Sequence, residues 1–312
     1  MTEETYTYSM EAPVEDAPAT VVSLVPSITE SMFDLNLGSR LIGRTEYCIY
    51  PEGKVDSIPT IGGTKNPDIQ RIIGMNPALV MANFEENRKQ DVEALQAAGI
   101  PVWVTFPRTI QETFNFLWSI MSLFDETTMV ARIRLIEQVY DRILNLTEAR
   151  EEERGLAKVF VPIWYEMLES SDDAPSKPDS YLMTANKDTY LHDVLYTCGA
   201  ENVFAHRERQ FPLQADLGEA ASLTSDNPRV QGRDTRYPRI TLAEVEAAQP
   251  DVILLPSEPF QFTEQHISIF KKLDVPAAKH DRIHLVDGSL LTWHGTRVAY
   301  ALDQLPTLFR LG

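Results

Sequence analysis

One long helical segment constrains this chain more than any other feature of its sequence. Residues 125–155 read DETTMVARIRLIEQVYDRILNLTEAREEERG, without proline and with no glycine before Gly155. Asp125 is the expected N-cap and Gly155 the expected C-terminal stop. Apolar side chains recur at steps of three and four and therefore share one helical face: Met129, Ile133, Ile136, Tyr140, Ile143 and Leu144.

The length of this helix predicts more than one lobe. About 28 residues at roughly 1.5 Å each span about 40 Å, whereas a lobe of ~100–150 residues has a radius of gyration of only about 13–15 Å. We therefore expect the helix to run past one lobe and onto another. The alternative is one long helix inside an all-helical domain.

Strands alternating with helices flank the long helix on both sides, which predicts parallel sheets with crossover helices. The apolar runs of strand length that precede it are Thr20–Pro26, Leu41–Gly43, Ala78–Ala82 and Pro101–Phe106. Those that follow it are Lys158–Trp164, Tyr181–Thr184, Asp251–Pro256 and Ile283–Val286.

The two halves also share a weak repeat, because Ile72–Met81 (IIGMNPALVM) has the layout of Val245–Leu254 (VEAAQPDVIL). The predicted fold is α/β, with two similar lobes on central parallel sheets bridged by one long α-helix. The predicted divisions are a disordered acidic tail (1–19), an N-terminal α/β lobe (20–124), the bridging helix (125–155) and a C-terminal α/β lobe (156–312). Two segments interrupt the alternation: Glu169–Asp179, expected to be a surface excursion, and Leu213–Thr235, expected to be either a functional lid or disordered.

Composition excludes several classes of function. The net charge of −18 disfavours nucleic acid and anionic membrane surfaces as partners. The sequence has no run of 18 apolar residues, so we expect no membrane span. The first twenty residues lack the basic and apolar regions of a signal peptide. We expect a cytoplasmic protein as the sequence stands, or a periplasmic or extracytoplasmic one if the N-terminus was trimmed. Cys48 and Cys198 fit free thiols in a reducing compartment better than a disulfide framework.

Ligands of open parallel α/β sheets lie beyond the carboxyl ends of the strands. Aromatic and polar residues are mixed at these predicted ends, which suits a large, partly flat and partly apolar ligand. The alternative for the aromatic residues is that they fill a contact between the lobes. Arg236 either meets a ligand carboxylate or phosphate, or is a solvated surface residue. The candidate ligand-binding residues are Pro26, Ser27, Tyr47, Thr64, Lys65, Phe106, Trp164, Arg236, Phe260 and Trp293.

His294 is the single candidate for an axial metal ligand, because it follows Trp293 near a predicted strand end. No two histidines have the spacing of a metal site. The alternative is a structural histidine that forms hydrogen bonds inside the fold.

Several segments together resemble a known family. VVSLVPSITESMFDLNLGSRLIG, IGGTKNPDIQRIIGMNPALVMA and LQAAGIPVWVTFPRTIQE are similar to the first lobe of the class III substrate-binding proteins, the helical-backbone receptors for cobalamin, haem and ferric siderophores. DTYLHDVLYTCGAENVF, ITLAEVEAAQPDVILLPSEPF and IHLVDGSLLTWHGTRVAYALDQLP resemble the second lobe. The resemblance covers about Val21–Leu311 apart from the two interrupting segments, and it is nearest to the cobalamin branch.

The resemblance implies a monomeric protein that holds cobalamin or another metal chelate as its ligand between two lobes, with little hinge motion and no catalytic cofactor. It also implies delivery of that ligand to an ABC permease. Receptors of the cobalamin branch dock through one surface glutamate on each lobe, and Gln70 and Thr292 occupy those places here.

The leading hypothesis is therefore a binding protein for a metal chelate, and not an enzyme. It acts either in ABC-type uptake or as a signal-less intracellular relative. Two alternatives stay open: an enzyme acting on such a chelate, and a regulatory protein that uses the long loop. The enzyme would need a titratable pair, for which the candidates are Glu46, Glu166, Asp188 and His294.

Overall fold

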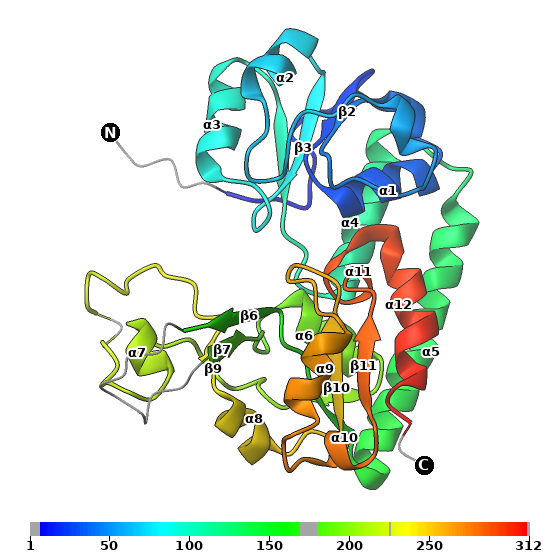
Figure 1. The fold of residues 1–312 in the computed structure, drawn as a ribbon. Helices are drawn as coiled ribbons and strands as arrows, with labels where there is room; N and C mark the ends of the chain where they lie inside the picture. Colours follow the sequence, from blue (N-terminus) through cyan, green and yellow to red (C-terminus); the bar gives the residue numbers. More distant parts are fainter. Residues whose placement is uncertain (1–6, 169–179, 225, 311–312) are drawn as a thin grey trace. The chain divides into compact units, whose positions relative to one another are not determined.

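The computed structural model describes residues 7–168, 180–224 and 226–310 (Figure 1). The chain separates into two compact units. The first unit comprises Met1–Val139 with Trp293–Ala299, and the second comprises Tyr140–Thr292 with Tyr300–Gly312. The predicted segment Glu169–Asp179 lies outside the described residues.

The first unit is built on a four-stranded parallel sheet with the strand order β2-β1-β3-β4. Its strands are β1 Val21–Ser23, β2 Leu41–Arg44, β3 Leu79–Asn83 and β4 Val102–Thr105. Its helices are α1 Pro26–Asp34, α2 Ile69–Met75, α3 Lys89–Ala97 and α4 Ile110–Leu123, with 3-10 turns at Gly38–Arg40 and Val55–Ser57. The central strands β1 and β3 are buried throughout, as expected of strands covered on both faces.

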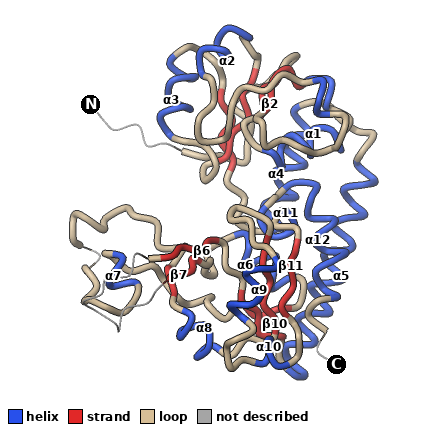
Figure 2. The backbone as a smooth tube through the Cα atoms, viewed as in Figure 1, coloured by secondary structure: helices blue, strands red, loops and turns tan. Residues whose placement is uncertain are grey.

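The second unit contains two sheets. A four-stranded parallel sheet has the order β11-β10-β5-β8, and a three-stranded antiparallel sheet has the order β6-β7-β9. The strands are β5 Ala157–Phe160, β6 Trp164–Met167, β7 Ser180–Met183, β8 Ala200–Asn202, β9 Arg239–Ile240, β10 Val252–Pro256 and β11 Ile283–Val286. The helices are α6 Tyr190–Thr197, α7 Leu213–Asp216, α8 Leu242–Ala248, α9 Glu264–Phe270, α10 Pro276–Lys279, α11 Ser289–Thr292 and α12 Val298–Gln304, which starts in the first unit (Figure 2).

A parallel sheet in each unit confirms the predicted α/β fold. The strand predicted at Lys158–Trp164 is wrong in its second half, because β5 ends at Phe160 and Trp164 starts the antiparallel strand β6. After α11 the chain forms a 3-10 turn at Gly295–Arg297 (η3), α12 and a second 3-10 turn at Leu305–Thr307.

The long helix is α5, Val130–Arg154, and it continues from the first unit into the second. Asp125 is not its N-cap, which corrects the prediction. Asp125 has a φ of 50° and donates its backbone N–H to the Ser122 carbonyl, so it belongs to the turn that ends α4. Gly155 ends the helix as predicted, with a φ of 77° that favours glycine.

The predicted apolar stripe of α5 is confirmed. Ile133 and Ile136 are buried, and Met129, Tyr140, Ile143 and Leu144 are half-buried. Leu135, Val139 and Leu146 of the same helix are exposed. Burial of the stripe on one face is what stabilises so long a helix, because propensity alone leaves isolated helices marginal.

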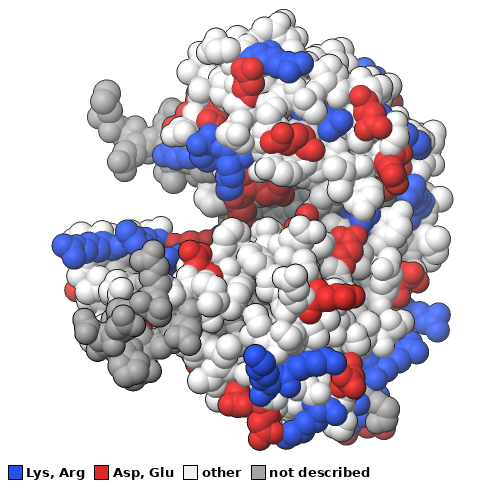
Figure 3. Space-filling model, in the orientation of Figure 1, with Lys and Arg blue, Asp and Glu red and all other residues white. Residues whose placement is uncertain are grey.

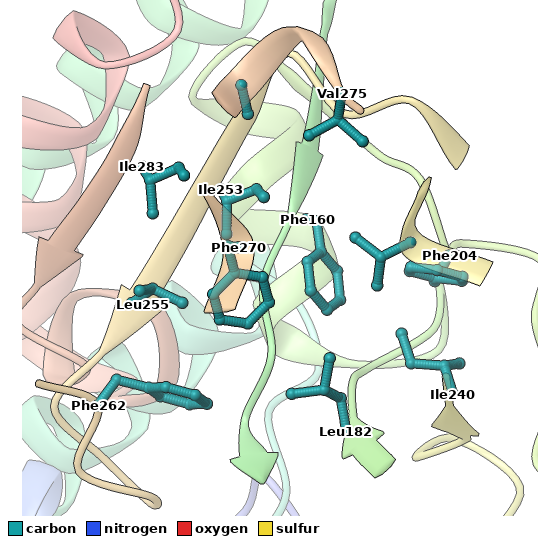
Figure 4. Packing of buried hydrophobic residues seen from close by; sticks show 12 residues of the cluster. Phe160, Leu182, Phe204, Ile240, Ile253, Leu255, Phe262, Phe270, Val275 and Ile283 are labelled. Atoms are coloured by element: carbon teal, nitrogen blue, oxygen red, sulfur yellow. The ribbon is translucent and has the colours of Figure 1, made fainter. Parts of the chain in front are cut away.

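The core of the second unit joins its two sheets (Figure 4). Phe160 of β5 packs edge-on against Phe204, with ring centroids 5.4 Å apart, and lies 6.2 Å from Phe270 of α9. Leu182 of β7 and Ile240 of β9 bring the antiparallel sheet into the same cluster. The antiparallel strands are therefore part of the fold's hydrophobic core.

The segment Leu213–Thr235, predicted to be a lid or disordered, is anchored by one buried carboxylate. Asp216 at the end of α7 accepts hydrogen bonds from the backbone N–H groups of Gln210 (2.9 Å) and Arg239 (2.7 Å). Its carboxylate also forms an ion pair with Arg207 at 3.1 Å. The buried Asp216 carboxylate is thus paired. A buried charge needs such fixed partners, and a disordered loop would not hold them in place.

The described part of the N-terminal segment contacts the first unit. The Ser9 backbone N–H donates to the Val104 carbonyl (2.9 Å), and the Trp103 indole N–H donates to the Ser9 carbonyl (2.9 Å). These contacts at Ser9 differ from the predicted disorder, because the edge strand β4 offers unpaired backbone groups to a neighbouring segment. Residues 1–6 of the predicted tail lie outside the described residues.

A short stretch from the C-terminal part of the chain belongs to the first unit. In η3 and the residues around it, Arg297 forms a buried ion pair with Glu30 of α1 at 2.9 Å. Gly295 has a φ of 81°, and a Cβ there would collide with the Ser31 side chain, so only glycine fits. The Ser31 hydroxyl accepts the Thr296 backbone N–H at 3.1 Å.

Ile136→Ala should lower the free energy of unfolding by about 2–4 kcal/mol, since Ile136 is only 7% exposed and truncation leaves a cavity. Leu135→Ala is the matched control on the same helix, because Leu135 is 61% exposed. It should cost roughly 0.5 kcal/mol or less. Urea unfolding of both variants measures the difference, and equal costs would contradict the assigned buried face.

Arg297→Ala should destabilise the protein by about 3–5 kcal/mol, because it leaves the Glu30 carboxylate buried without this cation. The matched control is Arg132→Ala, which removes an ion pair to Asp34 of the same helix α1. The Arg132 side chain is 43% exposed, against 8% for Arg297. That change should cost about 1 kcal/mol or less. Urea unfolding measures both values. An equal loss in the free energy of unfolding in the two variants would contradict the prediction that the buried pair stabilises the protein more than the exposed one.

Candidate functional site

Four loops meet at the carboxyl edge of the first unit's parallel sheet. Among the predicted residues there, Tyr47 follows β2 and is 56% exposed, the most accessible aromatic ring of this edge. Thr64 is half-buried and Lys65 is exposed. These three residues therefore offer side-chain surface at the edge where α/β sheets bind ligands.

The loop that carries Thr64 and Lys65 is held by its neighbours. The Glu46 backbone N–H donates to the Gly62 carbonyl (2.9 Å), and the Asn87 side chain donates to the Thr64 carbonyl (3.0 Å). The Lys65 ammonium donates to the Glu85 carbonyl at 2.5 Å. A Cβ on the neighbouring Gly63 would lie 3.1 Å from the Tyr47 ring, so glycine lets the loop pack against that ring. The sequence IGGTKNP therefore forms a close-packed loop beside Tyr47.

Phe106 follows β4 and is largely buried. Its ring lies 5.2 Å from that of Phe84, which follows β3, and the Arg108 guanidinium lies 5.8 Å from its centroid. Phe84 was not among the predicted site residues, although it directly follows a buried strand in the sequence.

Pro26 and Ser27 begin α1 at the carboxyl end of β1, and both are buried. The Ser27 hydroxyl faces the His294 imidazole, with 3.4 Å between Oγ and Nε2. Pro26 and Ser27 therefore lie beneath the surface of this edge, where they pack against other residues of the first unit.

His294, the predicted metal ligand, is only 4% exposed. Its Nε2 lies 3.3 Å from the Asn83 side-chain amide as well as near Ser27, and its ring meets Phe116 edge-on at 5.8 Å. Burial lowers the pKa of His294 to about 4, which keeps the imidazole neutral near pH 7. This placement favours the structural alternative, and ligation of a metal by His294 stays a prediction that would require the ring to be uncovered.

Trp293 is buried in the first unit. Its ring packs edge-on against Tyr50 at 5.9 Å, and the Arg297 guanidinium lies 5.7 Å from it and 4.3 Å from Tyr50. Its contacts are those of a core residue, and a role for Trp293 as a ligand wall stays a prediction.

In the second unit, the candidate residues Trp164 and Phe260 lie side by side. Trp164 is 37% exposed, and its ring meets Phe260 edge-on at 5.7 Å. Phe260 also contacts Phe262 at 4.8 Å and His266 at 5.3 Å. The Trp164 indole N–H donates to the Glu166 carboxylate at 3.0 Å. An accessible indole thus stands on an aromatic cluster that holds it in place.

Arg236 is held by a neighbour in sequence. Its Nε donates to Asp234 Oδ1 at 3.0 Å and a terminal nitrogen donates to Oδ2 at 2.7 Å, a two-point contact with one carboxylate. The guanidinium also lies 5.3 Å from the Tyr237 ring. The charge of Arg236 is therefore balanced within the loop, and a ligand contact by this residue stays a prediction.

Lys and Arg side chains and Asp and Glu side chains are both scattered over the visible face of each unit (Figure 3). Across residues 7–168, 180–224 and 226–310, no group of three or more His, Cys, Asp and Glu side chains is arranged to hold a metal ion. None of the helices in the described part of the chain has the length and apolar composition needed to cross a membrane.

Comparisons with known proteins agree on one class. No family model matches the chain. The uncharacterized ABC transporter substrate-binding lipoprotein YvrC of Bacillus subtilis is 22% identical over 310 residues, which cover 95% of this chain and 82% of that protein. The vitamin B12-binding protein of Vibrio parahaemolyticus is 26% identical over 194 residues, covering 62% of this chain and 63% of that protein. The matched part thus spans less than two thirds of this vitamin B12-binding relative.

Solved structures show the same fold. A periplasmic heme binding protein from Pseudomonas aeruginosa superposes with a TM-score of 0.68 at 16% identity, covering 94% of this chain and 92% of that chain. The periplasmic vitamin B12 binding protein BtuF of Vibrio cholerae gives 0.64 at 17% identity, covering 94% and 96%. The chain is a homologue of ABC transporter substrate-binding proteins and has their class III fold.

This homology confirms the predicted family resemblance and fold. The homologues are binding proteins, which fits the binding hypothesis. Within each unit, the candidates for a catalytic pair share no hydrogen bond or ion pair among the described residues: Glu46 with His294 in the first unit, and Glu166 with Asp188 in the second. Glu166 accepts hydrogen bonds from Trp164 and Tyr181 instead.

Acidification should destabilise this binding-protein homologue through His294. The unfolded imidazole titrates near pH 6.5, whereas burial lowers the pKa in the folded protein to about 4. The unfolded chain therefore takes up the proton first. The stabilising effect is complete above about pH 6.5 and is lost as the pH falls towards 4, by about 3 kcal/mol in all.

Urea unfolding at a series of pH values between 7 and 4 measures this loss. His294→Gln should flatten the pH profile by the stated amount, whatever its stability at pH 7. His280→Gln, at an exposed histidine, is the control and should keep the profile of the unmodified protein. An unchanged slope in His294→Gln would show that other groups cause the acid sensitivity.

Proposed function

We propose that this protein binds a metal chelate of the cobalamin, metal–tetrapyrrole or ferric-siderophore class, as the substrate-binding component of an ABC-type uptake system. One observation carries the proposal. Each unit has an accessible aromatic ring beyond the carboxyl end of a strand of its parallel sheet. Tyr47 follows β2, and Trp164 follows β5 and begins β6.

Aromatic rings at a sheet edge suit a flat, rigid ligand. Each ring contributes a large apolar area while losing little rotamer entropy on binding. The Trp164 ring rests on Phe260 and the Tyr47 ring on the loop at Gly63, so both are positioned before a ligand arrives. Such preorganisation lowers the entropic cost of binding. That one ligand meets both edges stays a prediction from the family resemblance.

The metal in this proposal is cargo held by its own chelator. The described residues supply no three-ligand cluster, and His294 is buried. The polar groups near Tyr47, including Thr64 and Lys65, would instead meet the polar periphery of the chelate. Which chelate is preferred depends on how those groups match it.

In this role the protein works outside the cytoplasm and delivers its ligand to a permease. The homologues include a lipoprotein and periplasmic binding proteins, which supports this location over the cytoplasmic alternative. At the two positions expected to dock on a permease, Gln70 is exposed and Thr292 donates its hydroxyl to the Glu258 carboxylate at 3.0 Å. We infer that docking uses other groups, with Glu258 a candidate beside Thr292.

Calorimetric titration of the purified protein with cyanocobalamin, haemin and a ferric siderophore tests the proposal. We expect one-to-one binding of at least one of these probes, with quenched tryptophan fluorescence and recovery of the chelate unaltered by mass spectrometry. Binding of none of them would contradict the proposed ligand class, and chemical conversion of the chelate would support the enzymatic alternative.

Tyr47→Ala and Trp164→Ala should each weaken binding of that probe by about 1–3 kcal/mol, the value of withdrawing a large apolar contact. Leu146→Ala is the matched control, because Leu146 on α5 is also 56% exposed but lies on no strand end. It should leave the affinity unchanged. If all three variants bind like the unmodified protein, the ligand does not lie at the strand ends.

A further inference from the structure

We infer that Tyr8, in the segment before β1, is a ligand-contacting residue of the first unit. The inference rests on the proposed function and adds to it a wall that comes from outside the α/β sheet. The ligand it would serve is a flat macrocycle with a polar rim, because a tyrosine offers an aromatic face and a hydroxyl together.

Two hydrogen bonds fix the backbone next to Tyr8. The Ser9 backbone N–H donates to the Val104 carbonyl, and the Ser9 carbonyl accepts the Trp103 indole N–H, both at 2.9 Å. Trp103 and Val104 lie in β4, an edge strand of the sheet. Since Val104 is the penultimate residue of β4, Tyr8 is brought to the carboxyl end of that strand.

The Tyr8 ring stands on both aromatic residues of this edge. It meets Phe84 edge-on at 5.3 Å and 67°, and Phe106 at 5.0 Å and 80°. Phe106 is largely buried and Phe84 half-buried, whereas Tyr8 is 43% exposed. Tyr8 is therefore the outer ring of the three, and a ligand approaching this edge meets it before it meets Phe106.

The neighbours of this trio belong to the same edge as the other candidate residues. Phe84 is followed directly by Glu85, whose carbonyl accepts the Lys65 ammonium at 2.5 Å. The chain thus places an aromatic surface next to the Thr64–Lys65 loop, and Tyr8 extends that surface. The opposite role, a cover that must leave before a ligand binds, predicts the reverse effect of mutation.

Titration of the full chain with cyanocobalamin and with haemin tests the inference. Tyr8→Ala should weaken binding of the probe that the unmodified protein binds by about tenfold, and Tyr8→Phe should stay within about threefold. Ser9→Pro, which removes the N–H that anchors the segment, should weaken binding like Tyr8→Ala. Tyr300→Ala is the matched control, since Tyr300 is also 43% exposed, and should bind normally. Thermal unfolding verifies that each variant is folded.

A second measurement detects contact directly. Bound probe should protect Tyr8 from nitration by tetranitromethane, read by peptide mass spectrometry, while Tyr300 in the same sample stays reactive. Unchanged affinity in Tyr8→Ala without protection overturns the inference while the proposed function stands. Tighter binding in Tyr8→Ala also overturns it and identifies Tyr8 as a cover. Failure of the unmodified protein to bind any probe overturns both.

Discussion

The buried ion pair between Arg297 and Glu30 holds the first unit together at the point where a distant part of the chain enters it. Charges removed from water are costly unless they are paired, and here both side chains are almost completely enclosed. The Arg297 guanidinium also stacks over Tyr50 at 4.3 Å. Once this pair is formed, Trp293 and His294 have to lie in the first unit, and Gly295 has to pass against Ser31 without a side chain.

The candidate site at the carboxyl edge therefore consists of a buried supporting layer and an accessible layer. Buried groups such as Ser27, Asn83 and His294 contact one another and form the support. Tyr47, the Thr64–Lys65 loop and Tyr8 form the accessible layer. A neutral His294 fits this division, because a buried imidazolium would require a partner that the two hydrogen-bonding neighbours, an amide and a hydroxyl, do not supply.

The second unit also holds an accessible ring on buried residues, but that ring lies on a different kind of strand. Its accessible indole, Trp164, is carried by the antiparallel strand β6 and not by the parallel sheet. The aromatic cluster around Phe260 packs against the same core that joins both sheets. The loop arginines nearby in sequence are balanced by carboxylates, Arg236 by Asp234 and Arg207 by Asp216. Recognition on this unit would therefore depend on ring surface more than on unpaired charge.

The α/β class, the long helix with its buried stripe, and most strands and helices of the parallel sheets can be predicted from the sequence. These follow from apolar periodicity, which reports local burial. Tyr47, Trp164 and Phe260 could be selected for the same reason, because each follows a readable strand. Phe84 was readable too, but its single position carried no stronger signal than its neighbours.

The remaining features depend on contacts between segments that are distant in the sequence. Strands β6 and β9 are short and antiparallel, and no local period reveals them. The run Tyr181–Thr184 predicts β7, but not its antiparallel pairing with β6 and β9. The capture of Ser9 by β4, the anchoring of a loop by Asp216 and the pairing of Arg297 with Glu30, 267 residues apart in sequence, are long-range contacts. They buried Trp293 and His294 and brought Tyr8 to the candidate edge, because the partners of a side chain depend on which distant segments fold against it.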